Sequence, residues 1–74
     1  MRQLNKKNPH TIYGKSYTWP DILSVVRTEL EAQGHSYVTS GLSMAIVIRK
    51  IWTPKHKDTD AILLEYARHL LKPA

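Results

Sequence analysis

The most apolar stretch of the chain, MAIVI, lies between a Ser-Gly pair and a group of basic residues. Its Ile and Val side chains are branched at Cβ and suit a pleated strand, and Ser40-Gly41 is a dipeptide typical of turns. We therefore expect a β-hairpin with residues 37–39 and 44–51 as its arms. A helix over residues 40–52 is the alternative, because a short apolar run does not distinguish a buried strand from a buried helix.

A first amphipathic helix is predicted over residues 19–33, where apolar residues recur at spacings of three and four. Thr18 can cap its N-terminus, with Pro20 in the first turn and Asp21 placed to complete a capping box. Gly34 suits the left-handed conformation that ends many helices. Both ends of this helix are therefore defined by local signals.

A second helix is predicted over about residues 60–72, after Pro54 has interrupted regular structure. Acidic residues lie at its start and basic residues at its end, which complements the helix dipole. Its apolar stripe consists of Leu63, Tyr66, Ala67, Leu70 and Leu71. This stripe gives the helix a face that packs on the rest of the domain.

With a short edge strand over residues 11–17, the expected order of elements is β-α-β-β-α. We predict an α+β domain with two helices on one face of a three-stranded sheet, whose central strand places Met44, Ile46 and Ile48 on one buried face. A helical segment at residues 40–52 would instead give an all-α or ribbon-helix-helix-like chain. Residues 1–10 have no hydrophobic periodicity and are predicted to form a flexible basic arm, which leaves residues 11–74 as a single globular domain.

The length and composition exclude several classes of protein. Seventy-four residues suffice for one small core, and the absence of cysteine excludes disulfides and thiolate metal sites. No stretch approaches the roughly 20 apolar residues that span a bilayer, and the first ten residues lack the apolar core of a signal peptide. We expect a soluble cytoplasmic protein without membrane contact.

The charge is positive and unevenly distributed. Eleven Lys and Arg against six Asp and Glu give a net charge of +5. Residues 1–17 and 49–57 contain basic residues and no acid, and together they carry the excess. Segregated positive charge favours a polyanionic partner.

These blocks predict a nucleic-acid-binding regulator, DNA or RNA, of the kind that phages, plasmids and bacteria encode. The basic side chains would neutralise phosphates, and Trp52 beside the second block could stack on a base. The predicted contact residues are Lys6, Lys7, Lys15, Arg49, Lys50, Trp52, Lys55 and Lys57. A protein-binding module, an inhibitor or adaptor of a larger enzyme, is the alternative, with a docking surface at the edge of residues 11–17 or at a cluster of Tyr37, Ile51 and Trp52.

No motif indicates catalysis, a cofactor or a metal. The four histidines, His10, His35, His56 and His69, are scattered without the spacing of a metal site. We therefore expect no enzymatic activity, no cofactor and no metal site. A metal-free ribonuclease with His35 or His56 as general base is the enzymatic alternative.

Overall fold

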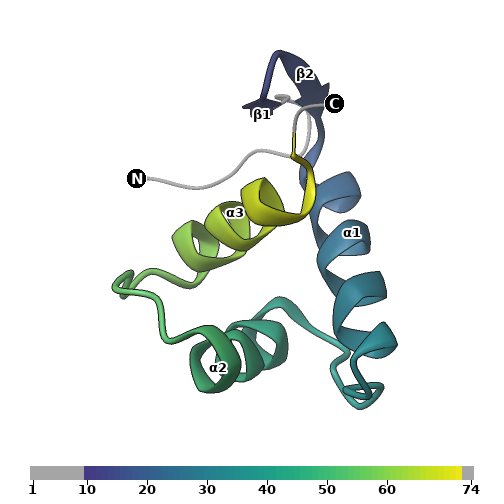
Figure 1. Ribbon diagram of the computed structural model, residues 1–74, viewed down its shortest axis with the longest axis vertical. Helices are drawn as coiled ribbons and strands as arrows, with labels where there is room; N and C mark the ends of the chain where they lie inside the picture. Colours follow the sequence, from purple (N-terminus) through teal and green to yellow (C-terminus); the bar gives the residue numbers. More distant parts are fainter. Residues whose placement is uncertain (1–9, 73–74) are drawn as a thin grey trace.

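The computed structural model describes residues 10–72 as a β-hairpin followed by three helices. The elements are β1 (His10–Ile12), β2 (Lys15–Tyr17), α1 (Trp19–Ala32), α2 (Gly41–Trp52) and α3 (Thr59–Leu70). Figure 1 shows the hairpin at one end of the molecule, with α2 and α3 beside α1. The predicted fold class, two helices on a three-stranded sheet, is wrong, because the sheet in the described residues has two strands. An all-α or ribbon-helix-helix-like chain does not describe the molecule either, since the hairpin precedes the helices.

The hairpin replaces the single edge strand expected over residues 11–17. Its strands pair antiparallel, with Ile12 opposite Lys15. Tyr13 and Gly14 connect them and both have positive φ, 52° and 80°, as a two-residue type I′ turn requires. Glycine adopts this conformation without a Cβ clash, which suits Gly14 to the second position of the turn.

α1 confirms the predicted first helix and its capping. The Asp21 N–H donates to Thr18 Oγ1 at 3.4 Å, and the Thr18 N–H donates to Asp21 Oδ2 at 3.1 Å. Gln33 caps the C-terminus, and Gly34 follows with a φ of 95°. The position of this helix could be predicted because its capping interactions join residues that are close in the sequence.

α2 occupies the segment predicted to be the central strand, so the helical alternative for residues 40–52 is confirmed. Ser40 has an extended backbone and caps the helix, its Oγ accepting from the Ser43 N–H at 3.3 Å. The side chains that α2 buries are Met44, Ala45, Val47 and Ile48, a helical spacing. Ile46, expected in the core, is 47% exposed. The strand propensity of the Ile and Val residues does not decide the structure here, because the Ser40 cap and the spacing of the buried residues both favour a helix.

α3 packs on both α1 and α2, which contact each other less. It begins after the Asp58 cap and ends at Leu70, close to the prediction. The core consists of Ile12, Ile22, Val26, Leu30, Val38, Met44, Ala45, Val47, Ile48, Ile62, Leu63, Tyr66 and Ala67. The hairpin, the connection after α1 and all three helices thus contribute to one core. Within residues 10–72, no helix has the length and hydropathy needed to cross a bilayer.

Candidate functional site

The predicted nucleic-acid contacts fall in separate parts of the fold. Arg49, Lys50 and Trp52 lie in the last turn of α2, Lys55 and Lys57 lie in the loop of residues 53–58, and Lys15 begins β2. Lys6 and Lys7, together with most of the predicted basic arm, lie outside the described residues. The structure therefore brings together the second basic block and leaves Lys15 apart from it.

α3 separates Lys15 from the second block. The hairpin lies at the C-terminal end of α3, where Lys15 and Lys72 line the same cavity, whereas the loop of residues 53–58 leads into its N-terminal end. Figure 1 shows the hairpin and this loop at opposite ends of α3. A helix of 12 residues is about 18 Å long at 1.5 Å per residue.

Arg49 connects the end of α2 to the following loop. Its Nη2 donates to the backbone carbonyls of His56 at 3.2 Å and of Lys57 at 2.9 Å. The helix ends at Thr53, which has a left-handed φ of 48° and donates its N–H to the Arg49 carbonyl at 3.1 Å. Pro54 then prevents continuation of the helix. The guanidinium thus holds the loop against the last turn of α2.

We call Arg49, Lys50, Lys55 and Lys57 the basic segment. All four side chains are exposed. In the described part of the chain, none of its three lysines forms an ion pair with a carboxylate. The two basic residues in the last turn of α2 also complement the helix dipole, which accounts for part of their presence there. Lys55 and Lys57 lie beyond the helix and have no such role.

Trp52 is half-buried beside the basic segment and packs on α3. Its ring centroid lies 5.4 Å from that of Tyr66 and 4.5 Å from that of His69, the latter in an edge-to-face arrangement. These contacts occupy part of the indole surface. Only the remaining part is open to a stacking base.

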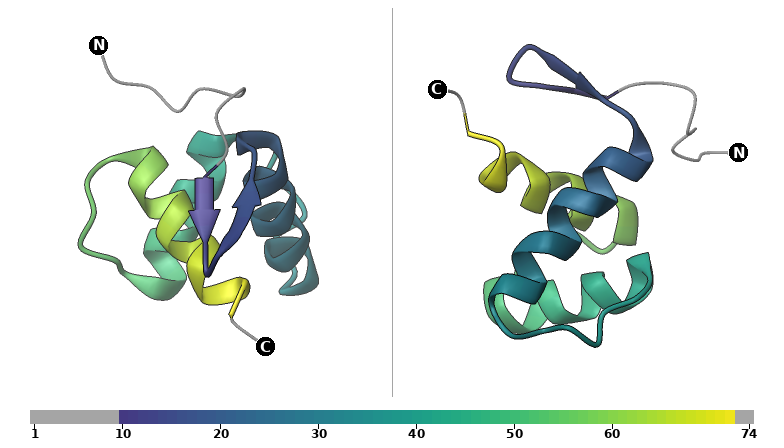
Figure 2. Two further views of the ribbon diagram at one scale, coloured as in Figure 1. Left: turned by 90° about the horizontal axis from the view of Figure 1, so that it is seen from above. Right: turned by 90° about the vertical axis from the view of Figure 1, so that its right-hand side faces the viewer.

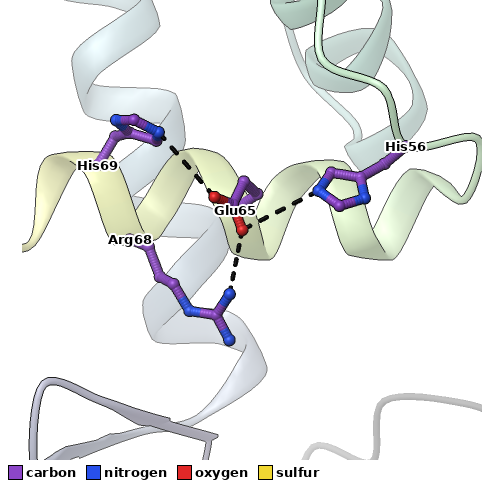
Figure 3. A network of polar contacts seen from close by, with 4 residues as sticks. All are labelled: His56, Glu65, Arg68 and His69. Atoms are coloured by element: carbon purple, nitrogen blue, oxygen red, sulfur yellow. Dashed lines mark hydrogen bonds and ion pairs between the residues drawn. The ribbon is translucent and has the colours of Figure 1, made fainter.

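Glu65 is the centre of a polar network that the sequence reasoning missed. Figure 3 shows His56 and His69 on either side of its carboxylate. Glu65 Oε1 accepts from Arg68 Nη1 at 3.0 Å and lies 3.9 Å from His56 Nε2, and Oε2 lies 4.0 Å from His69 Nε2. Spacings of three and four on a helix could have revealed Arg68 and His69. His56 reaches Glu65 only through the path of the loop.

Tyr66 connects α3 to the end of α1. Its hydroxyl accepts from Gln33 Nε2 at 3.2 Å, and Gln33 also donates to Glu29 at 2.8 Å. Burial raises the pKa of the Tyr66 hydroxyl above its ordinary value of 10.0; the Gln33 hydrogen bond opposes this effect and the Glu29 charge adds to it. Tyr66 therefore provides a fixed, neutral surface on which Trp52 packs.

The two histidines considered as general bases, His35 and His56, lie in different connections of the fold. His35 lies in the connection between α1 and α2 against Tyr37, whereas His56 lies in the loop before α3. Among residues 10–72, no group of three or more His, Asp or Glu side chains is placed to hold a metal ion. Comparison of the chain with protein-family models, with curated proteins and with solved structures finds no match.

Proposed function

We propose that the protein binds nucleic acid through the basic segment and contacts mainly the phosphate backbone. The observation that carries the proposal is the pair of hydrogen bonds from Arg49 to the His56 and Lys57 carbonyls. They hold the loop so that Lys55 and Lys57 lie near the end of α2 that carries Lys50. Because the loop backbone is already held, phosphate binding has to order only the lysine side chains, at about 0.5 to 1.5 kcal/mol each.

The surrounding charges support the same surface. Glu65, the carboxylate of the polar network, already accepts from Arg68. Asp58 caps α3, its Oδ1 accepting from the Asp60 N–H at 2.9 Å. The acids Asp21, Glu29 and Glu31 all lie on α1. The basic segment itself contains no acid, and Glu65 and Asp58 both accept hydrogen bonds from donors of the protein.

A charge-matched pair of double variants tests the proposal. Lys55→Gln/Lys57→Gln and Lys15→Gln/Lys72→Gln remove the same charge at opposite ends of α3. Binding of labelled duplex DNA and of single-stranded RNA is measured by fluorescence anisotropy between about 50 and 200 mM salt. If two phosphate contacts are lost, the first variant lowers the slope of log Kobs against log salt by about 1.4 to 1.8. The second leaves the slope for duplex DNA unchanged, because Lys15 and Lys72 lie at the other end of α3.

The role of Arg49 is tested by substitutions that keep the charge. Arg49→Lys loses the planar fork that reaches two carbonyls, whereas Lys50→Arg leaves the loop untouched. We expect weaker binding and faster tryptic cleavage in residues 53–58 for Arg49→Lys alone. Equal losses for the two charge-matched double variants would show that net charge, not the basic segment, drives binding. Absence of binding at the lowest salt concentration refutes the proposal altogether.

A second candidate function, a protein-binding module, is favoured by the outer face of α2. Leu42 and Ile46 are 64% and 47% exposed and lie one helical turn apart. The docking cluster predicted from the sequence is dispersed instead: Tyr37 precedes α2, and Ile51 and Trp52 end it. A partner that is captured from a nuclease-treated lysate by the wild-type chain but not by Leu42→Gln/Ile46→Gln would support this function.

A further inference from the structure

A cavity of about 380 Å³ lies between the hairpin and the end of α3. Its apolar lining comes from Ile12, Leu70 and Leu71, two tyrosine rings line it from the hairpin, and Lys15 and Lys72 contribute positive charge. Figure 2 shows the hairpin over the C-terminal end of α3 in two further orientations. The volume falls within the range of about 300 to 1,000 Å³ that is usual for small-molecule sites.

The pleat of the hairpin explains why these side chains share one cavity. Ile12 and Lys15 are directly opposite each other, as are His10 and Tyr17. Opposite residues, and residues two apart along a strand, lie on the same face of a sheet. Ile12, Lys15 and Tyr17 therefore all lie on the face toward α3, which is consistent with the burial of Ile12.

Tyr13 is held in an uncommon conformation at the edge of this cavity. Its φ of 52° is in the left-handed region, where a type I′ turn usually has Asn, Asp or Gly. The residue is 56% exposed, so its side chain gains little from packing. Strained residues of this kind cluster at ligand-binding sites. A bound planar group would supply the contact that the ring lacks.

Lys15 and Lys72 give the cavity its charge preference. They come from opposite ends of the chain and line the same cavity, and none of its lining residues is acidic. Within the described residues neither lysine forms an ion pair. Two lysines at one small cavity suit a dianionic group such as a phosphate.

We propose that this cavity binds a nucleoside monophosphate, a small molecule that carries a planar base and one phosphate. The planar ring of the ligand packs against Tyr13 and Tyr17, and its phosphate lies between Lys15 and Lys72. The site is separate from the basic segment, and its occupancy does not depend on the proposed nucleic-acid binding.

Uridine 5′-monophosphate is the probe, and uridine and inorganic phosphate test its two halves. We expect saturable shifts of the backbone amides of residues 12–17 and 70–72 in two-dimensional NMR spectra of the full chain, complete below about 10 mM ligand. Uridine alone and phosphate alone should bind at least about tenfold more weakly, since each makes only part of the contacts. Absence of saturable shifts, or saturable shifts confined to residues 49–57, overturns the proposal.

Variants separate this site from the basic segment. Tyr13→Asn removes the ring and suits the turn, so the fold is retained, and affinity for uridine 5′-monophosphate should fall at least about fivefold. Lys15→Gln/Lys72→Gln should lower this affinity at least about tenfold and leave uridine binding unchanged. Lys55→Gln/Lys57→Gln should leave both affinities unchanged. If the two lysine pairs have equal effects, the anion is not bound in the cavity and the proposal is wrong.

Discussion

Two isoleucines of α2 provide a matched test of the helix and its orientation. Ile48 is fully buried in the core, whereas Ile46, two residues earlier, is 47% exposed. In a strand the two side chains would share one face, and substitution of either would have a similar cost. In the helix their surroundings differ, so Ile48→Ala and Ile46→Ala should differ strongly in the free energy of unfolding.

The expected costs follow from burial. Truncation of a fully buried isoleucine costs about 2 to 5 kcal/mol, the lost transfer free energy plus the cavity left behind. For a chain of this length the whole stability is about 4 to 11 kcal/mol, so Ile48→Ala removes a large share of it. Ile46→Ala loses part of a half-exposed side chain and gains a few tenths of a kcal/mol in helix propensity. Its net cost should be below about 1 kcal/mol.

Urea unfolding followed by far-UV circular dichroism measures both values. With a slope of about 1 kcal/mol per molar urea, a loss of about 3 kcal/mol lowers the midpoint by about 3 M. Ile46→Ala should shift the midpoint by less than about 1 M. Similar large losses for both variants would refute the orientation of α2, and a costly Ile46→Ala with a harmless Ile48→Ala would place the opposite face of the helix in the core.

Two further predictions concern local interactions. Because burial raises the pKa of Tyr66 above 10.0, folding favours its neutral form, and this contribution to stability is present below about pH 10 and lost as the pH rises through the folded-state pKa. In urea unfolding at about pH 8 to 11, Tyr66→Phe should therefore lose less stability at alkaline pH than wild type. The exposed control Tyr37→Phe should follow wild type. Thr18→Ala should lower the free energy of unfolding by about 1 kcal/mol through loss of the α1 cap. Its control, Thr28→Ala on the exposed face of α1, should change the free energy of unfolding by less than about 0.5 kcal/mol. Equal effects of the two variants would show that the capping box does not stabilise the helix.

The sequence by itself determined the features that depend on near neighbours. α1 was predicted with its caps because Thr18 and Asp21 satisfy each other within one turn and Gly34 suits the left-handed residue after the helix. The location of α3 was also predictable, from its apolar stripe and its charged ends. In both cases the signal and the structure it specifies lie within a few residues of each other.

Only the tertiary structure decided the state of residues 41–52 and the composition of the sites. A short run of Ile and Val can form a strand or a helix, and the choice depends on the partners that bury it. Here α2 packs on α3 and buries Met44 and Ile48 at helical spacing, and the described residues contain no third strand to pair with them. The contact of His56 with Glu65 depends on the path of the loop before α3, and the shared cavity of Lys15 and Lys72 joins residues distant in the chain. Such contacts have no local signal, because packing of the hairpin and loops against α3 creates them.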